Sequence, residues 1–150
     1  MVQSRAWAAP ADESTPAGGL GGIMWFGPSS ALGTVYTPFF VGMADIPKSF
    51  RSGHQLKFDR TSAFWAGVFA HNCANLKWSY AIKDVEARQQ TLELLSVGMV
   101  SLADQAFAKD GNVKAADKSF LTNAAQVVKS LWSLSDEIMF KVLSLSPSLS

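Results

Sequence analysis

The sequence predicts an α+β fold in which strands come first and helices follow. Eight of the 11 glycines and five of the 6 prolines lie within residues 1–53. Beyond Arg60 the chain is rich in alanine, leucine, lysine, glutamine and serine, with apolar residues at helical spacing. Because turn formers and helix formers are segregated in this way, strands and helices should form separate layers. We expect one domain over residues 1–150, with strands and loops in 1–60 and helices in 61–150.

Three short segments in the first part are predicted to be strands. Val2–Trp7 is the first of them, and the polar, turn-forming segment Ala8–Leu20 follows it. Gly22–Phe26 and Thr34–Val41 are aromatic and β-rich, and the loop between them contains glycine and proline, which predicts a hairpin with a long connection. Both runs are apolar at nearly every position, so both faces of the sheet should be covered.

Three helices are predicted in the second part, namely Ser62–Lys83, Val85–Ala108 and Asp117–Leu143. In each, apolar residues recur at intervals of three and four and should face the core. In the first helix these residues are Phe64, Val68, Leu76 and Tyr80. In the second they are Val85, Leu92, Leu95, Met99, Leu102 and Ala106. In the third they are Phe120, Ala124, Val127, Leu131, Leu134, Ile138 and Val142.

The helix ends carry recognisable signals. Thr61 or Ser62 is expected to cap the first helix, and Asp84 is expected to cap the second. The run Asp110-Gly111-Asn112 should end the second helix, because glycine readily adopts the left-handed conformation found after helix C-termini.

Composition and charge restrict the classes of partner. Hydrophobic residues make up 48% of the chain and charged residues only 17%, which indicates a folded protein with apolar surface to be covered by something else. The net charge is +1 and no basic stripe is visible, so we expect neither nucleic acid nor an anionic membrane as a partner. Self-association is an open possibility because of the aromatic load.

The chain shows no mark of secretion or membrane insertion. It has a single cysteine and therefore no internal disulfide, and it has no N-glycosylation acceptor. The N-terminal residues lack the apolar run of a signal peptide. Residues 14–44 are uncharged, but their glycines and prolines argue against a membrane span. An intracellular location is expected.

The usual catalytic signatures, such as a nucleophile elbow or a Walker lysine, are absent from the sequence. Cys73 and His71 lie two residues apart in a predicted helix, so their side chains should point to nearly opposite sides. Cys73 is therefore expected to be a small buried hydrophobe. His71 and His54 have no partners at metal-ligand spacing, so no metal or other cofactor is expected.

Arg5 is the charge of greatest interest. It lies in the middle of the short apolar segment Val2–Trp7, where an arginine must be paired or must face a cavity. The residues alone leave two interpretations open, a paired surface arginine and a binding residue.

Several runs, in order along the chain, resemble the C-terminal part of PepD-type dipeptidases, which are cysteine-nucleophile Ntn hydrolases related to the secernins. The runs of this chain that carry the resemblance are, from first to last, Val2–Trp7, Gly22–Gly27, Tyr36–Pro47, Phe58–Ala66, Trp78–Val85 and Phe120–Asn123, followed by Trp132 and Asp136. The similarity spans nearly the whole chain.

This resemblance implies part of an αββα sandwich, in which two sheets lie between helical layers. In such enzymes a cysteine at the mature N-terminus is the nucleophile and its own α-amino group is the base. That cysteine belongs to the N-terminal half, which we expect to be missing here, so no residue of this chain is assigned as catalytic. Arg5 lies in a strand where related enzymes carry an active-site arginine, which implies a substrate-binding role.

The sequence thus predicts the C-terminal part of a dipeptidase that hydrolyses dipeptides or short peptides by cysteine acyl transfer. The chain alone should be inactive and would act only when completed by an N-terminal half. The alternative is a non-catalytic α+β binding or structural protein, such as a degenerate paralogue.

Overall fold

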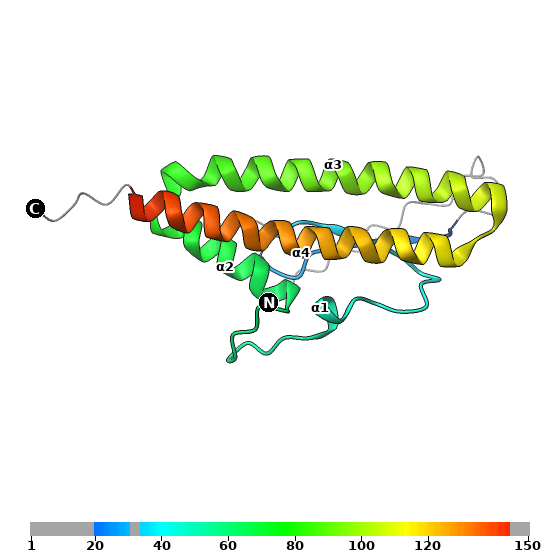
Figure 1. Cartoon of the computed structure of the whole chain (residues 1–150), viewed down its shortest axis with the longest axis horizontal. Helices are drawn as coiled ribbons and strands as arrows, with labels where there is room; N and C mark the ends of the chain where they lie inside the picture. Colours follow the sequence, from blue (N-terminus) through cyan, green and yellow to red (C-terminus); the bar gives the residue numbers. More distant parts are fainter. Residues whose placement is uncertain (1–19, 31–33, 145–150) are drawn as a thin grey trace, which may run out of the picture.

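The computed structural model describes residues 20–30 and 34–144. Two strands, β1 (Ile23–Phe26) and β2 (Thr37–Phe40), come first, and a one-turn helix, α1 (Lys48–Arg51), follows. Three longer helices complete the described chain, namely α2 (Ala63–Leu76), α3 (Trp78–Asp110) and α4 (Val113–Ser144). Figure 1 shows α3 and α4 running side by side along the long axis of the molecule. The α+β class with strands before helices is confirmed.

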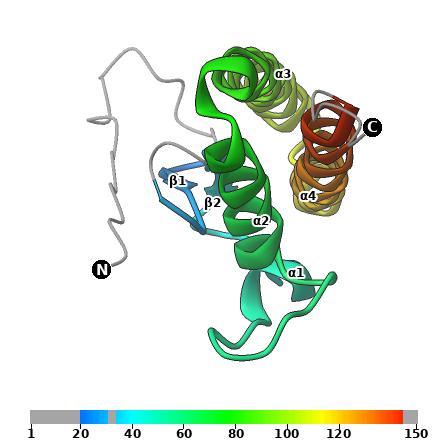
Figure 2. The same ribbon diagram turned by 90° about the vertical axis from the view of Figure 1, so that its left-hand side faces the viewer.

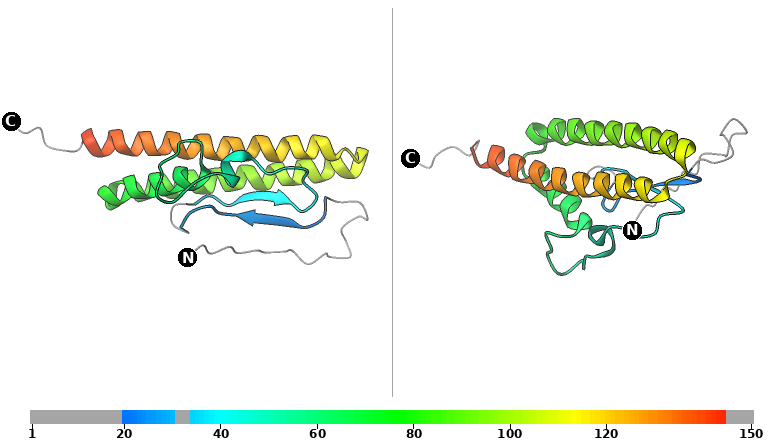
Figure 3. Two further views of the ribbon diagram at one scale, coloured as in Figure 1. Left: turned by 90° about the horizontal axis from the view of Figure 1, so that it is seen from below. Right: turned by 45° about the vertical axis from the view of Figure 1, so that its right-hand side comes forward.

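The two strands form the expected hairpin. β1 and β2 pair antiparallel, with Ile23 opposite Phe40 and Phe26 opposite Thr37. They are shorter than the predicted runs Gly22–Phe26 and Thr34–Val41 but lie within them. Figure 3 shows the hairpin lying along one side of the long helices. The predicted strand Val2–Trp7 lies outside the described residues.

Helix α4 is the centre of the core, as its apolar spacing predicts. All seven residues assigned to its core stripe are buried. At one end they pack with Cys73 of α2 and Val85 of α3, and at the other end Phe120 packs with Phe40 of β2. Because a single stripe meets both other long helices and the sheet, α4 holds the layers together. No helix in the described part of the chain is both long and apolar enough to span a membrane.

The first predicted helix, Ser62–Lys83, is wrong in its end point. The helix stops at Leu76, and Lys77 adopts the non-helical angles φ −144° and ψ 69°. The chain turns there, and Trp78 begins α3, which Figure 2 shows leaving α2 in a new direction. The turn moves Leu76 and Tyr80 away from the core, so both side chains are exposed.

The buried face of α2 is correspondingly different from the predicted stripe. Phe64 and Val68 are only half-buried. The residues buried on α2 are all small, namely Ala63, Ala66, Gly67, Ala70, Cys73 and Ala74. Small side chains let the backbones of two helices approach closely, and this face lies against Leu131 and Leu134 of α4. The larger aromatic residues therefore lie beside the contact and not within it.

The core stripe predicted for the second helix is only partly correct. Val85 and Leu92 are buried and Met99 is half-buried, but the other three predicted residues are exposed. The small residues Ser96 and Ala103 are buried in their place. At 3.6 residues per turn, Leu95, Leu102 and Ala106 lie about 60° to 100° around the helix from the centre of the buried stripe, at the edge of the contact.

The predicted helix ends have mixed outcomes. Gly111 ends α3 in the left-handed conformation at φ 65°, with its N–H donating to the carbonyl of Phe107 at 2.7 Å, as predicted. Ser62 precedes α2, but its hydroxyl donates to the carbonyl of Ser52 and does not cap the helix. Asp84 is not a cap, because α3 begins six residues before it. Its carboxylate instead pairs with Lys141 of α4 at 2.7 Å.

Candidate functional site

Cys73, the only thiol in the chain, is an unfavourable nucleophile in this structure. It lies on the buried face of α2 and is only 3% exposed, in a cluster with Ala70, Leu134 and Ile138. Burial raises the pKa of the thiol, and the carboxylate of Asp136 raises it further. Since the thiolate is the reactive form, a raised pKa lowers reactivity. The prediction that Cys73 is buried is confirmed.

The two histidines are also not arranged for catalysis. His71 lies with its ring edge-on to Trp78, with 5.9 Å between the ring centroids, and in the described residues no hydrogen bond joins it to Cys73. Nδ1 of His54 accepts a hydrogen bond from the N–H of Leu56 at 3.2 Å. The lone pair of this nitrogen is therefore used by a neighbour in the same loop. Within residues 20–30 and 34–144, no group of three or more histidine, cysteine or acidic residues could hold a metal ion.

Arg5, assigned to substrate binding by the resemblance, lies outside the described residues. Its neighbours in the fold are therefore not placed, and its role stays a prediction.

A cluster that the separate motifs did not predict joins the loop before α2 to α4. We call it the aromatic corner, and it consists of Phe58, Arg60, Trp65, Phe69 and Trp132. The ring centroid of Phe58 lies 5.5 to 5.9 Å from those of the other three aromatic residues. The guanidinium of Arg60 lies 4.8 Å from the ring centroid of Trp132, a cation–π contact.

Arg60 also forms an ion pair with Asp136, at 2.9 Å. Both side chains are more than half exposed, so the ion pair itself contributes about 1 kcal/mol at most. Nearby, Asp59 accepts the N–H and hydroxyl of Thr61 at 2.8 and 2.7 Å. The hydroxyl contact is the main reason that the pKa of Asp59 is lowered. These contacts fix the loop on the helices.

Among the described residues, the hairpin has one closed edge and one open edge. The amide of Val41 donates to the carbonyl of Gly22, so alternate residues from Val41 back to Val35 point their main-chain groups toward β1. The residues between them point theirs outward, and α3 supplies their partners. The N–H of Tyr36 donates to Glu93 Oε1 at 3.0 Å, and the carbonyl of Thr34 accepts Gln89 Nε2 at 2.6 Å.

Two further features complete the closure of the β2 edge. Pro38 occupies an outward position and has no N–H to leave unpaired. The carbonyl of Phe40 accepts the N–H of Met43 at 3.1 Å. Helix α3 therefore takes the place of a neighbouring strand along this side of the hairpin.

The opposite edge, on β1, is open within the part of the chain that the structure describes. By the same alternation, the main-chain groups of Ile23 and Trp25 point away from β2, and the described sheet contains these two strands alone. Unpaired strand edges are templates for adding another strand. This edge is the surface of the hairpin that can accept more sheet.

None of the protein-family models, curated proteins or solved structures compared with this chain matches it.

Proposed function

We propose that this chain is the C-terminal part of a PepD-type dipeptidase, a cysteine-nucleophile Ntn hydrolase that cleaves dipeptides or short peptides. The cysteine nucleophile would lie in a part of the enzyme outside these 150 residues. On its own the chain would be inactive. Its role would be to supply helical and sheet layers of the domain and, through Arg5, a contact to substrate.

The aromatic corner is the observation that carries the proposal. Two of the runs that carry the resemblance are Phe58–Ala66 and the segment with Trp132 and Asp136. Arg60 in the first run and Asp136 in the second are 76 residues apart in the sequence. The two runs meet through the contacts of Arg60 with Trp132 and Asp136. A resemblance that came from chance would not require its separate runs to contact each other. Their meeting supports a shared ancestral packing.

The hairpin and helices also agree with the arrangement that the resemblance implies. In an αββα sandwich, α2, α3 and α4 would form one outer helical layer and the hairpin would belong to a sheet beneath it. Further strands would add at the open edge of β1, because the β2 edge is closed by Gln89 and Glu93. The remaining sheet and the second helical layer would come from the missing half.

The chemistry proposed for the completed enzyme is acyl transfer. The thiolate attacks the peptide carbonyl, the amine leaves after gaining a proton, and water then hydrolyses the thioester to release the acid and regenerate the thiol. Cys73 does not fit this role, since it is buried, its pKa is raised and it lies within helix α2.

The test is a dipeptidase assay of the purified chain with a panel of dipeptides and a thiol reductant. We expect no turnover above background, with Cys73→Ala indistinguishable from the wild type. Turnover that Cys73→Ala abolishes would overturn the proposal and make Cys73 the nucleophile.

The coding sequence upstream of Met1 provides a second test, in which turnover is expected. An in-frame extension with a cysteine at a processed start, co-expressed with this chain, should give turnover that survives Cys73→Ala. An upstream region without such a cysteine would favour the second candidate, a non-catalytic α+β binding protein. The exposed leucines on the outer side of α3 are the observation that favours this second candidate.

A further inference from the structure

The segment between the start of α1 and α2 is a local concentration of basic charge. We call residues 48–57 the basic arm, and they include Lys48, Arg51 and Lys57 but no acidic residue. All three basic side chains are exposed, and Arg51 is paired with Asp45 at 3.1 Å. Figures 1 and 2 show the arm projecting from the side of the long helices. The net charge of the whole chain, only +1, conceals this concentration.

The arm is held on the start of α2 by hydrogen bonds. The carbonyl of His54 accepts the N–H of Lys57 at 3.1 Å and the Nε1–H of Trp65 at 3.1 Å. The hydroxyl of Ser62 donates to the carbonyl of Ser52 at 2.9 Å. A ligand of the arm would therefore not have to order it, and preorganisation of this kind lowers the entropic cost of binding.

A hollow of about 480 Å³ lies where the arm returns toward α2. The residues that line it are Gly53, His54, Lys57, Phe58 and Asp59. A hollow of this size admits a side chain of a peptide, whereas the face of a bilayer or of a nucleic-acid duplex passes over it. Its shape therefore favours a ligand that presents separate side chains.

Two lysines at the hollow are available to an anionic group. The pKa of Asp59 is lowered mainly by the hydroxyl of Thr61 and to a smaller extent by the charges of Lys57 and Lys48. Both ammonium groups are therefore close to this carboxylate. In the part of the chain that the structure describes, neither lysine is in an ion pair. A carboxylate of a ligand can form charge-assisted hydrogen bonds with them.

Asp59 makes the hollow unsuited to a surface of continuous negative charge. Its Oδ1 accepts both hydrogen bonds from Thr61, and the second oxygen of a carboxylate can accept further bonds. A phosphate placed beside Asp59 would be repelled. A peptide can instead offer this carboxylate a main-chain N–H and place its own carboxylates on the lysines. The mixed charges thus favour an acidic peptide over nucleic acid or an anionic membrane.

Apolar side chains beside the hollow suit the same ligand. Leu56 is 91% exposed and Phe58 is 51% exposed. The ring of Phe58 packs edge-on against Trp65 at 5.5 Å between centroids, and the rest of its surface is open. An apolar side chain of a bound peptide would cover both residues, and burial of such surface contributes to binding.

We propose that the basic arm binds an acidic peptide segment of a partner protein. A carboxylate of the segment lies on Lys48 and Lys57, and a main-chain N–H of the segment donates to Asp59. An apolar side chain of the segment covers Leu56 and Phe58. The segment is held and not cleaved, so this proposal does not depend on the dipeptidase proposal.

The first test is the fluorescence anisotropy of a labelled peptide in which glutamates flank one leucine, titrated with the full chain. We expect saturable binding that weakens as salt is added, and no binding of the same peptide with glutamine in place of glutamate. The double variant Lys48→Gln and Lys57→Gln should raise the dissociation constant by at least about tenfold, because both cations are lost.

The matched control makes the same change in net charge elsewhere. Lys114→Gln and Lys118→Gln remove two exposed lysines at the start of α4, at the end where α3 and α4 are joined. This double variant should leave the dissociation constant within about twofold, since distant exposed charges are screened. Absence of binding to the glutamate peptide, or equal effects of the two double variants, would overturn the proposal.

Leu56 tests the apolar part of the site. Leu56→Ser should raise the dissociation constant by about threefold or more, because a contact of the peptide's leucine is lost. Leu143→Ser, at an exposed leucine on α4, should leave it unchanged. The same effect of both substitutions would show that Leu56 is not in the interface.

The last test distinguishes a peptide from other anions by competition. At the same concentration of negative charge, the unlabelled peptide should displace the labelled one better than duplex DNA or phosphatidylserine vesicles do. Asp59→Asn should reduce this preference by at least about threefold, because asparagine keeps an oxygen for Thr61 but loses the charge that repels phosphate. Stronger displacement by DNA or by vesicles, or a preference that Asp59→Asn leaves unchanged, would count against an acidic peptide as the ligand.

Discussion

Small residues decide where the helices of this protein meet. Ala66, Gly67, Ala70 and Ala74 lie on the side of α2 that faces α4, so the two backbones approach closely and leave little space for solvent around Cys73. The cysteine is in this respect equivalent to the alanines beside it. Its burial is a consequence of packing and carries no sign of chemical use.

The reactivity of Cys73 should reflect this environment. Because burial raises the pKa of the thiol, it stays protonated at pH values where a free cysteine begins to ionise. We expect labelling by a thiol reagent at pH 8 to be at least tenfold slower in native buffer than in denaturant. Equal rates in the two conditions would contradict both the burial and the raised pKa.

At the scale of elements, α4 has two distinct roles. Its apolar stripe packs against α2 and α3, while its polar side chains pair with α3. Arg88 NH1 donates to the carbonyl and hydroxyl of Ser130, and NH2 pairs with Glu137 at 2.9 Å. The pKa of Glu137 is lowered, mainly by the hydroxyl of Ser133 and to a smaller extent by Arg88. Ser96 of α3 and Asn123 of α4 bond each other midway along the helices.

Leu131 should be one of the most sensitive positions of α4. It is fully buried between α2 and α3, with Ala63, Ala66 and Leu92 around it. Leu131→Ala should lower the free energy of unfolding by about 2–5 kcal/mol, because it removes a buried branched side chain and leaves a cavity. Leu143→Ala, on an exposed part of the same helix, is the control and should change it by less than about 0.5 kcal/mol. Chemical denaturation of both variants measures the difference, and similar values would show that the stripe does not face the core.

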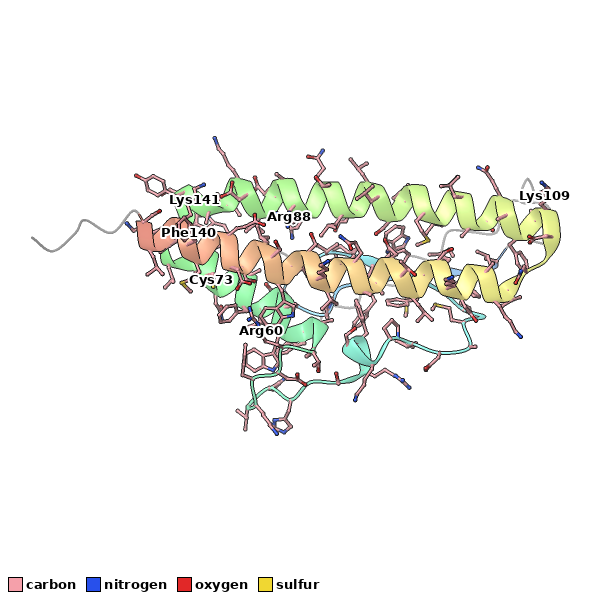
Figure 4. The ribbon with its side chains drawn as sticks, viewed as in Figure 1. Arg60, Cys73, Arg88, Lys109, Phe140 and Lys141 are labelled. Atoms are coloured by element: carbon pink, nitrogen blue, oxygen red, sulfur yellow. The ribbon has the colours of Figure 1, made fainter. Side chains whose placement is uncertain are left out.

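At the scale of the whole molecule, the distribution of apolar surface is the notable property. Exposed large hydrophobic side chains occur on β1 at Met24, on the outer side of α3 and near the C-terminal end of α4 at Phe140 (Figure 4). Contiguous exposed apolar surface is typical of a protein that has an interaction partner. We therefore expect the isolated chain to associate and to bind a hydrophobic dye, and, if the dipeptidase proposal holds, to be rescued by co-expression with the N-terminal half that it requires.

The open β1 edge should contribute to self-association of the chain. Ile23→Pro removes an outward N–H while keeping every β1–β2 hydrogen bond, so it should reduce the larger species seen by analytical ultracentrifugation. Met24→Pro is the matched control, because the N–H of Met24 points toward Phe39 of β2. It should instead destabilise the hairpin and increase dye binding. The contrary outcome is that the wild-type and Ile23→Pro chains are both monodisperse, bind no dye and unfold in one sharp cooperative transition. That result would count against the proposal that the chain is part of a dipeptidase and would favour the non-catalytic binding protein.

The sequence by itself determined the features that depend on local chemistry. The hairpin within Gly22–Val41, the core stripe of α4 and the end of α3 at Gly111 all follow from patterns within a few residues of each other. The core stripe of α4 was predictable because α4 packs against both other long helices and the sheet, so all seven predicted residues are buried, but the helix begins at Val113, four residues before the predicted start at Asp117. The dipeptidase resemblance and the role of Arg5 remain predictions.

Tertiary structure alone decided which faces of α2 and α3 are buried and which edge of the sheet is closed. Burial depends on how closely neighbouring elements approach, and here close approach selects alanine, glycine and serine over the phenylalanines and leucines that a periodicity argument prefers. The break at Lys77 follows from the need to turn α3 back along α4. The contacts of Gln89 and Glu93 with the β2 edge span 55 and 57 residues. No local pattern encodes them, because only folding brings these residues together.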